Sequence, residues 1–287
     1  MSPAPQKLFC FGLGFTSLAL CTRLAAQGFA VSGTCRSADK ATALRARGID
    51  AHVYVPDQKL DDAALHGTTH VLLSVPPDEE GDPVARDFGA ALAALPLTWA
   101  GYLSTTGVYG DRGGDWVDEA SPLAPSTARG ARRLLAEQQW AALNLPLHIF
   151  RLAGIYGPGR NQLVSLREGK ARRIIKEGQV FSRIHVDDIA EILIASIARP
   201  DTGAAYNVCD NEPAPPQEVV AYAAELLGLA PPPEIKFEDA DLSPMAKSFY
   251  AESKRVSNKR IREELGVALK YPTYREGLTA LLEQDKK

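Results

Sequence analysis

The chain has 287 residues and a formal net charge of −3 at neutral pH, with 45% hydrophobic and 23% charged residues. This length and composition are typical of a soluble globular protein with a substantial core, and they argue against wholesale disorder. The slightly acidic balance excludes a general basic surface for nucleic acid or an anionic membrane, so we expect neither as a partner.

The first half of the chain alternates strand and helix patterns. Helices are predicted between and after short apolar segments, and the loop that precedes the last of them is rich in Gly, Asp and Pro. The predicted strands are 7–11, 30–35, 51–55, 69–75, 99–105 and 147–154, and the predicted helices are 16–27, 37–47, 83–95 and 126–140. Alternation of this kind predicts an α/β fold with a doubly wound parallel sheet of the Rossmann type.

Beyond residue 156 the pattern becomes irregular. The sequence predicts a short helix after "GPGRNQ", a small hairpin at 172–186, a helix at 187–198 and a strand, "AAYNVCD", that returns to the main sheet. Further helices are predicted after "EPAPPQE", at 256–266 and at 273–284. We therefore predict a Rossmann domain at 1–156, rejoined by 183–210, and a smaller C-terminal α/β lobe formed by 157–182 and 211–287.

A glycine-rich loop, "FGLGFTSLAL", follows the first strand and opens the first helix. Gly12, Gly14 and Ser17 have the GxGxxG spacing, with serine in the third place. In a βαβ context, Gly12 permits the tight turn, Gly14 lets a pyrophosphate approach the backbone, and the helix N-terminus, with Phe15 and Thr16, offers N–H groups to it. The alternative is an ordinary glycine turn, and the context favours dinucleotide binding.

The second strand ends in "GTCRSADK", without the Asp or Glu that an NAD-selective site usually places there. Thr34, Arg36 and Ser37 stand in this position, and an arginine would bind a 2′-phosphate that a carboxylate would repel. We therefore predict NADP(H) as the favoured cofactor, with NAD(H) as the alternative. Ser74, in the strand predicted at 69–75, completes the predicted cofactor-binding set.

Four further stretches follow the glycine loop in a fixed order: "YLSTTGVYGD", "FRLAGIYGPGR", "RIHVDDIAEI" and "AYNVCDNEP". Together they resemble the extended short-chain dehydrogenase/reductase superfamily, of the NAD-dependent epimerase/dehydratase type, over nearly the whole chain. The resemblance implies that the Rossmann domain is NAD(P)-binding and that the C-terminal lobe holds a small-molecule substrate, often a nucleotide sugar. It also suggests a homodimer.

The resemblance assigns the catalytic residues to three positions. Thr105 matches the family's catalytic Ser/Thr, while Arg129 and Arg133 occupy the places of the Tyr and Lys in YxxxK, with Gly130 and Glu137 keeping the family's spacing. Arginine has no acceptor and stays protonated far above neutral pH, so Arg129 cannot exchange the proton that the family's tyrosine exchanges. Arg133 can still donate hydrogen bonds to ribose hydroxyls.

Arg129, Arg132 and Arg133 are spaced i, i+3 and i+4, which places them on one face near the start of a helix. The helix dipole disfavours cations there. Two interpretations remain open: the arginines contact a cofactor phosphate or an anionic ligand group, or they form a solvated cationic face that Glu137 partly compensates.

The candidate substrate-binding residues lie in the same motifs: Thr106, Tyr109, Tyr156, Arg160 and Arg183. Phe181 stands near the place where members that bind nucleotide diphosphates have an arginine, so a nucleotide-sugar substrate is not carried over. We expect an NADP(H)-linked oxidoreductase or epimerase that acts on a small, anionic or sugar-derived substrate. The alternative is a catalytically silent dinucleotide-binding sensor of the nitrogen-metabolite-repressor type, which also lacks the Tyr/Lys pair.

The remaining signals concern cysteine, histidine and targeting. The four cysteines form no CxxC pair and are predicted to be buried thiols. His66 and His70 precede a strand rather than lying on a helix, so no metal site is predicted. The start, "MSPAPQKLFCFGLG", lacks the features of a signal peptide, and no stretch is apolar over 18 residues, which predicts a cytoplasmic protein.

Overall fold

The computed structural model describes residues 6–56, 60–199 and 203–286. The first five residues of the N-terminal stretch "MSPAPQKLFCFGLG" therefore lie outside the described residues. Its contacts divide the chain into two compact units. The first unit comprises the chain up to Thr105 with Ala131–Arg151 and Ile189–Tyr206, and the second comprises Thr106–Gly130, Leu152–Asp188 and the chain from Asn207 onward. Unlike the predicted domains, this division places 106–130, 152–156, 183–188 and 207–210 in the second unit.

The first unit is built on a seven-stranded sheet with the order β11-β7-β5-β4-β1-β2-β3. Its strands are β1 (Lys7–Phe11), β2 (Ala30–Cys35), β3 (Asp50–Val53), β4 (His70–Leu73), β5 (Trp99–Thr105), β7 (Leu147–Leu152) and β11 (Ala205–Val208). The pairings between β1 and β2, β1 and β4, β2 and β3, and β4 and β5 are parallel. The α/β fold and the return of "AAYNVCD" to the main sheet are confirmed, and the strand order changes direction between β1 and β4, where such sheets bind ligands.

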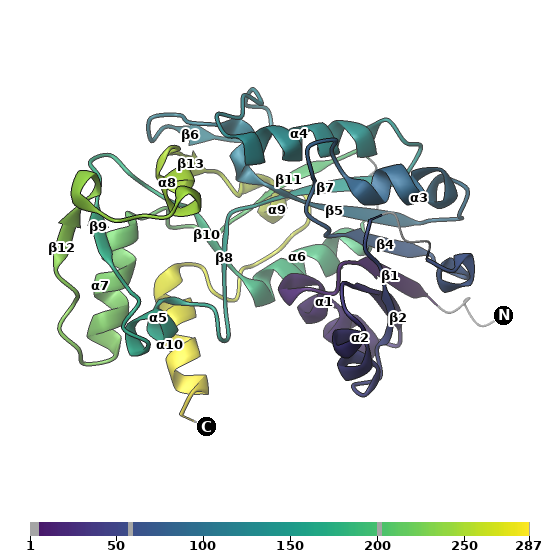
Figure 1. The fold of residues 1–287 in the computed structure, drawn as a ribbon, viewed down its shortest axis with the longest axis horizontal. Helices are drawn as coiled ribbons and strands as arrows, with labels where there is room; N and C mark the ends of the chain where they lie inside the picture. Colours follow the sequence, from purple (N-terminus) through teal and green to yellow (C-terminus); the bar gives the residue numbers. More distant parts are fainter. Residues whose placement is uncertain (1–5, 57–59, 200–202, 287) are drawn as a thin grey trace. The chain divides into compact units, whose positions relative to one another are not determined.

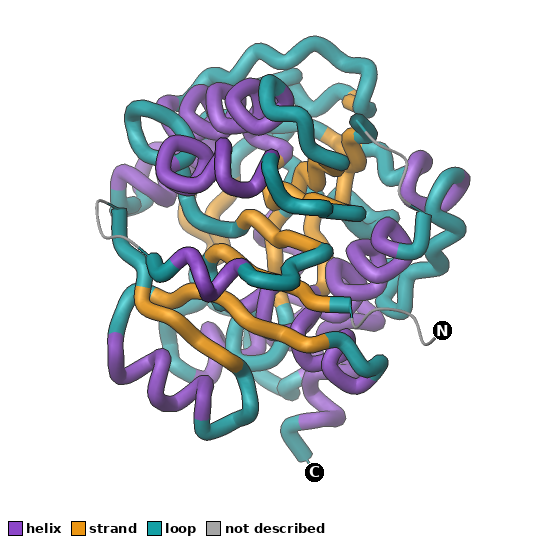
Figure 2. Tube along the Cα trace, turned by 90° about the vertical axis from the view of Figure 1, so that its right-hand side faces the viewer, coloured by secondary structure: helices purple, strands orange, loops and turns teal. Residues whose placement is uncertain are grey.

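Helices cover both faces of this sheet (Figure 1). They are α1 (Phe15–Ala26), α2 (Ala38–Arg45), α3 (Pro83–Ala93), α4 (Ala128–Ala141) and α6 (Val186–Ile197). Side chains alternate along β1, so Phe9 and Phe11 join the core cluster that contains Trp140 of α4, whereas Cys10 contacts Cys21 of α1 on the other face. Figure 2 shows the strands in orange between purple helices.

The second unit contains helices and short parallel strand pairs. Its elements are β6 (Trp116–Val117), β8 (Gly154–Tyr156), α5 (Gln162–Arg167), β9 (Arg173–Ile175), β10 (Arg183–His185), α7 (Pro216–Leu226), β12 (Glu234–Lys236), α8 (Pro244–Tyr250), β13 (Arg255–Val256), α9 (Lys259–Glu263) and α10 (Tyr274–Gln284). Three short 3-10 turns complete the assignment: η1 (Asp62–Leu65) in the first unit, and η2 (Thr106–Tyr109) and η3 (Phe237–Asp239) in the second. The apolar faces of α5, α7 and α10 pack together in one cluster.

The predicted hairpin at 172–186 is wrong. Its two strands, β9 and β10, pair in parallel with β12 and β8 instead of with each other. Both strands bury an isoleucine, Ile174 or Ile184, and each finds its partner in a distant segment rather than across the turn. The helix predicted at 256–266 is also shorter, because Arg255 and Val256 pair with β6 before α9 begins.

One expectation from the sequence concerns the four cysteines. All four cysteines are buried and unpaired by disulfides, as predicted. No described helix combines the length and the apolar character needed to cross a membrane. Within residues 6–56, 60–199 and 203–286 no group of three or more His, Cys, Asp and Glu side chains is arranged to hold a metal ion.

Candidate functional site

The glycine loop of the first unit requires glycine at its first position. Gly12 has a φ of +94°, and a Cβ there would lie 3.3 Å from the backbone carbonyl of Ser74. The Gly12 N–H donates to Thr34 Oγ1 at 3.0 Å, and the Leu13 N–H donates to the Thr34 carbonyl at 2.6 Å. Thr34 was predicted to contact the cofactor; the structure buries it, and its hydroxyl fastens the loop to β2.

The N-terminus of α1 has neither a side-chain cap nor an acidic residue in its first turn. Gly14 precedes the helix in an extended conformation without a side-chain cap, and a Cβ there would find its nearest neighbour only at 4.0 Å. The first turn, with Phe15, Thr16 and Ser17, has no acidic residue, and the buried Ser17 Oγ has no hydrogen-bond partner. Backbone N–H groups and the helix dipole favour a phosphate at such an end, so these residues fit a dinucleotide diphosphate.

The carboxyl ends of β2 and β4 supply the other predicted cofactor residues. Arg36 follows β2 directly and is exposed, whereas Ser37 caps α2 by accepting the Lys40 N–H at 3.3 Å. Ser74 follows β4, and its N–H donates to the Phe11 carbonyl at 2.9 Å. Arg36 and Ser74 are therefore at the edge of the sheet where the glycine loop lies, and the cap bond already uses the Ser37 hydroxyl as an acceptor.

The three arginines near the start of α4 have three different surroundings. In the first unit, Arg133 Nη1 donates to the Tyr102 hydroxyl at 3.1 Å and to the Leu103 carbonyl at 2.8 Å. Arg132 forms a surface ion pair with Glu79 at 2.8 Å. In the second unit, the Arg129 guanidinium lies 4.3 Å above the Phe249 ring. Each arginine must therefore be considered separately.

Glu137 does not compensate these arginines, so that part of the alternative interpretation is wrong. Its carboxylate is buried and accepts from Arg151 Nη2 at 2.9 Å and Nε at 3.3 Å, and the Ser104 hydroxyl donates a short hydrogen bond to it. This network joins α4 to β5 and β7. It fixes the strand that ends in Thr105 against the helix that holds Arg133.

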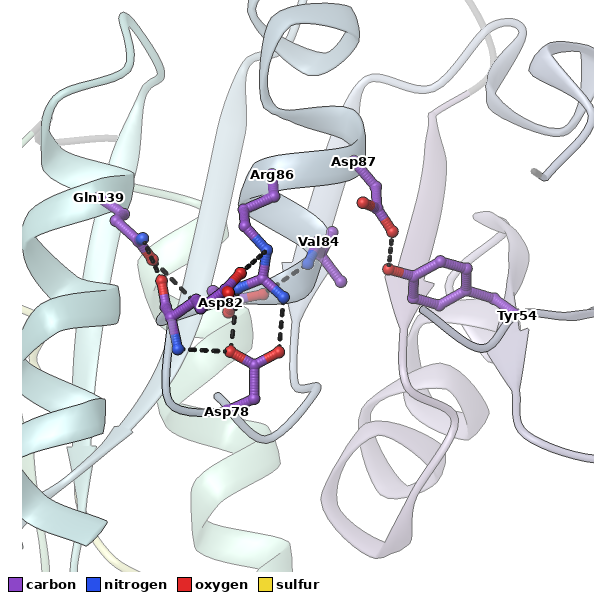
Figure 3. A network of polar contacts seen from close by, with 8 residues as sticks. Tyr54, Asp78, Asp82, Val84, Arg86, Asp87 and Gln139 are labelled. Carbon is purple, nitrogen blue, oxygen red and sulfur yellow. Dashed lines mark hydrogen bonds and ion pairs between the residues drawn. The ribbon is translucent and has the colours of Figure 1, made fainter. Parts of the chain in front are cut away.

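A second polar network, missed by the sequence analysis, fastens the loop between β4 and α3 (Figure 3). Asp82 is buried and accepts from Trp140 Nε1 and from the Val84 N–H, each at 2.9 Å. Gln139 accepts the Asp82 N–H at 2.7 Å and donates to the Glu80 carbonyl at 2.8 Å. The pair Asp82-Pro83 is a helix-start pattern that would have indicated the cap but not its contacts with α4.

Burial dominates the electrostatics of this network and its neighbour. It raises the pKa of the Asp82 carboxyl, although hydrogen bonds from Trp140 and Val84 oppose the shift. Burial also raises the pKa of Tyr54, whose hydroxyl donates to Asp87 Oδ2 at 2.6 Å. The Tyr54 phenol is therefore not suited to exchange protons with a ligand near neutral pH.

The predicted substrate residues of the second unit do not form one group. Tyr109 is fully buried and its hydroxyl donates to Asn207 Oδ1 at 2.7 Å, while Thr106 begins the η2 turn. Tyr156 and Arg183 lie on the paired strands β8 and β10. Arg160 is exposed in a tight turn with Gly157.

Burial shifts the pKa of both Tyr156 and Arg183. Burial raises the pKa of the Tyr156 phenol, which has no hydrogen-bond partner. Burial lowers the pKa of Arg183, whose Nη1 donates to the carbonyls of Phe181 at 2.8 Å and Ala214 at 3.2 Å. Arg183 therefore stabilises the fold around β10.

Asp210 is a buried carboxyl that the sequence did not single out. One of its oxygens accepts the Glu212 N–H at 3.2 Å, and the other has no hydrogen-bond partner. Burial raises its pKa to about 8, against an opposing effect of Arg183. It lies in the "YNVCD" motif, so the motif supplies a neutral buried acid rather than a surface ligand.

A salt bridge holds the start of α4 in the second unit. Lys254 Nζ donates to the Gly110 carbonyl and to Glu252 Oε2, both at 2.7 Å. Glu252 also accepts from the Ser126 hydroxyl at 2.8 Å. The segment after α8 is thereby tied both to the turn after Tyr109 and to the residues that lead into α4, and no sequence motif indicated this.

Comparisons with known proteins identify the family of the chain. Residues 91–209 match the model of the NAD dependent epimerase/dehydratase family. The chain is 30% identical to Protein YeeZ of Escherichia coli strain K12 over 283 residues, which cover 93% of this chain and 97% of that protein. It is 29% identical over 174 residues to a 3-diazoavenalumate denitrifying reductase of a Streptomyces species, covering 57% of this chain and 55% of the reductase.

Solved structures share the whole fold. A conserved protein from Silicibacter pomeroyi DSS is 55% identical, with a TM-score of 0.91, and the match covers 98% of this chain and 100% of that one. The UDP-glucuronic acid 4-epimerase of Bacillus cereus, solved in complex with NAD, has a TM-score of 0.78 over 98% of this chain and 97% of its own. Its 17% identity shows a common fold and nothing finer.

Proposed function

The chain belongs to the NAD-dependent epimerase/dehydratase family, and from this premise we propose that it binds a nicotinamide dinucleotide and uses it in an NADP(H)-linked oxidoreductase or epimerase reaction on a small substrate. The observation that carries the proposal is the glycine loop. Gly12 needs its positive φ, the space beside Gly14 is open, and α1 begins without a side-chain cap or an acidic residue. A diphosphate satisfies these N–H groups directly.

The preference for NADP(H) rests on Arg36. It is exposed directly after β2, and its neighbours in the chain, Cys35 and Ser37, carry no carboxylate to accept from the ribose hydroxyls. Its guanidinium suits a 2′-phosphate, with which it can form paired charge-assisted hydrogen bonds. NAD(H) remains the alternative, and the family's description names NAD.

The chemistry that a bound nicotinamide supplies is hydride transfer. We assign to Thr105, at the end of β5, a hydrogen bond to the substrate oxygen that gains or loses the proton. Arg133 is anchored to Tyr102 and Leu103 and has further N–H groups for ribose hydroxyls. Since neither Arg129 nor Arg133 can exchange a proton, the proton must pass through water or a substrate group.

A silent sensor is the second candidate, and a specific observation favours it. The place of the family's tyrosine holds Arg129 over the Phe249 ring, and the two tyrosines of the neighbouring motifs are not exposed, because Tyr109 is buried and donates to Asn207 and Tyr156 is buried. Such a protein would bind the dinucleotide without turning it over. The sensor and the enzyme would bind the dinucleotide at the same site, and they differ in whether hydride transfer follows.

Cofactor choice is tested by fluorescence titration with NADPH and NADH. We expect NADPH to bind at least about tenfold more tightly, and Arg36→Glu to reverse the order, since the new carboxylate would repel the 2′-phosphate. Arg47→Glu changes another exposed arginine of the same unit and should leave the ratio unchanged. Equal affinities in the natural protein would refute the NADP(H) preference, and no binding of either nucleotide would refute the proposal itself.

Turnover separates the two candidates. Carbonyl compounds and sugar nucleotides are screened for oxidation of NADPH, with the natural chain and with an Arg129→Tyr, Arg133→Lys double variant. Oxidation by the natural chain, lost in Thr105→Val, supports the enzyme. Tight NADPH binding without oxidation in either protein supports the sensor.

A further inference from the structure

Two short paired strands of the second unit, β8 and β10, carry polar side chains on the side that faces α10. In their parallel register Arg183 lies opposite Gly154, and Tyr156 lies two residues further along β8. Residues two apart on a strand share a face, so Arg183 and Tyr156 are on the same side of the pair. Helix α10 packs on this side, because a Cβ added to Gly277 would clash with the Tyr156 hydroxyl.

The guanidinium group of Arg183 is held through one of its three nitrogens. Nη1 donates to the carbonyls of Phe181 and Ala214, at 2.8 Å and 3.2 Å, and these two residues form a backbone bridge. Nε and Nη2 donate no hydrogen bond to the described residues, and Arg183 forms no ion pair with a carboxylate among them. Nε and Nη2 share the edge through which a guanidinium binds a carboxylate with two parallel hydrogen bonds. The side chain is half-buried, so a ligand can reach this edge.

Three enclosed polar atoms of the same region also have no hydrogen-bond partner within the described parts of the chain. They are the hydroxyls of Tyr156 and Tyr274 and the Oδ2 atom of Asp210. These residues are 8%, 1% and 1% exposed, respectively. Buried polar atoms in native proteins are nearly always paired, so three unpaired atoms in one region indicate a ligand that pairs with them.

Backbone and ring contacts place these atoms around Arg183. The Asp210 N–H donates to the Arg183 carbonyl at 2.6 Å. The guanidinium carbon lies 5.8 Å from the centroid of the Tyr274 ring, and Tyr274 precedes Gly277 by about one turn of α10. Burial lowers the pKa of Arg183, and the main residues that oppose this shift are Asp210, Tyr274 and Tyr156. All three therefore lie within electrostatic reach of the guanidinium.

The charges of this region suit a ligand with one negative charge. Arg183 keeps its positive charge near neutral pH, whereas burial raises the pKa of Asp210 to about 8, so that this carboxyl is largely protonated. Glu212, another acid near Arg183, lies 3.5 Å from Arg275. A desolvated cation without a counter-ion is unfavourable, and one negative charge neutralises it. A phosphate with two charges would leave one of them without compensation.

We propose that Nε and Nη2 of Arg183 bind the carboxylate group of a ligand. The other members of the site, which donate their O–H groups to that carboxylate, are Tyr156, Tyr274 and Asp210. The carboxylate belongs either to a small free acid or to the substrate of the oxidoreductase or epimerase. The second source rests on the proposed function.

The test is calorimetric titration of the full chain with acetate and with glucuronate, each in the presence and absence of NADPH. Acetamide and glucose are their uncharged counterparts, and inorganic phosphate tests the effect of a second charge. We expect each carboxylate to bind at least about tenfold more tightly than its counterpart, which lacks the charge-assisted hydrogen bonds. Tighter binding of glucuronate than of acetate, strengthened by NADPH, would identify the substrate as the source. Equal binding of the two would identify a small free acid.

Substitutions test the residues of the site. Arg183→Lys keeps the charge but loses the paired N–H groups, so acetate binding should weaken at least about tenfold. Tyr156→Phe and Tyr274→Phe should each weaken it about threefold or more. Without acetate they should not lower the melting temperature, because each hydroxyl that they remove has no partner among the described residues. The control Tyr222→Phe removes a hydroxyl that already contacts Thr279 Oγ1 at 3.1 Å, and it should leave acetate binding unchanged.

Three results would overturn the site. They are equal binding of acetate and acetamide, tighter binding of phosphate than of acetate, and unchanged acetate binding in both phenylalanine variants at positions 156 and 274. Melting curves verify that Arg183→Lys folds, and the phenylalanine variants decide the question if it does not. Acetate binding without binding of NADPH or NADH would refute the proposed function and leave the site standing. NADPH binding without binding of either carboxylate would refute the site and leave the proposed function standing.

Discussion

The two units differ in whether backbone or side chains form the features that bear on function. The proposed cofactor site of the first unit is formed by backbone: the φ of Gly12, the open space beside Gly14 and the N–H groups that begin α1. The contact between Arg129 and Phe249 in the second unit is formed by side chains. A backbone site can be deduced from glycine spacing, whereas a side-chain site depends on contacts between segments distant in sequence.

One buried carboxyl from each unit provides a second comparison. In the first unit, Glu137 and Arg151 are buried together, with side-chain exposures of 4% and 7%, and they satisfy each other. In the second unit, Asp210 is 1% exposed and keeps one oxygen without a hydrogen-bond partner. A paired buried charge stabilises only as a pair, while a lone buried acid is stable in its neutral form.

The largest expected effect comes from breaking the pair of the first unit. Glu137→Leu leaves Arg151 buried without its carboxylate, so the free energy of unfolding should fall by about 3–5 kcal/mol in urea denaturation. The double variant Glu137→Leu, Arg151→Met should recover much of this loss, because no unpaired charge remains. Arg132→Gln, which breaks an exposed pair with Glu79, serves as the control and should cost less than about 1 kcal/mol. A loss below about 1 kcal/mol in Glu137→Leu would show that the pair is not a structural element.

The buried carboxyl of Asp210 in the second unit should make the free energy of unfolding depend on pH. The pKa of Asp210 is raised to about 8 by burial, whereas an unfolded Asp has a pKa of about 3.9. The charge of Arg183 and the hydrogen bond from the Glu212 N–H oppose the shift, and the charges of Glu212 and Asp188 add to it. The folded state therefore retains a proton that the unfolded state releases, so this contribution to stability is complete below about pH 4 and is lost as the pH rises to about 8.

Asp210→Asn removes this dependence and preserves the shape of the neutral acid. Between about pH 5 and pH 7 the natural protein should lose about 2–3 kcal/mol relative to the variant, as measured by urea denaturation at each pH. Asp115→Asn, at an exposed carboxylate of the same unit, should follow the natural protein. Parallel curves for Asp210→Asn and the natural protein would mean that Asp210 is ionised in the folded state.

The elements of the first unit could be predicted from the sequence because their signals are local. The strands at 7–11, 30–35 and 99–105 match β1, β2 and β5, since each is a short apolar run between turn residues. The same local signals failed for β9 and β10, whose partners β12 and β8 are set by packing rather than by the intervening turn. Pairing of short strands is not encoded in either strand alone.

The candidate site could also be predicted only where its signal is local in the sequence. GxGxxG spacing located the cradle, but it could not show that the Thr34 hydroxyl holds the loop or that Glu137 binds Arg151 rather than facing the arginines. Phe249 lies 120 residues after Arg129 in the chain, and no periodicity connects the two. Contacts between distant side chains need the fold before they can be recognised.

Substitutions in the glycine loop should change stability least. They distinguish the effect of backbone conformation from the effect of space for a ligand. Gly12→Ala places a Cβ at a φ of +94° and 3.3 Å from the Ser74 carbonyl, so we expect a loss of about 2 kcal/mol in unfolding free energy together with loss of nucleotide binding. Gly14→Ala meets nothing closer than 4.0 Å at a φ of −101°, so melting should be nearly unchanged. Its methyl group would nevertheless occupy the space that a diphosphate needs, and NADPH affinity should fall at least about tenfold. If Gly14→Ala bound NADPH as tightly as the natural protein, the backbone beside Gly14 would not contact the cofactor. The comparison of the two units would then be wrong for the first unit, because its cofactor site would not be formed by backbone.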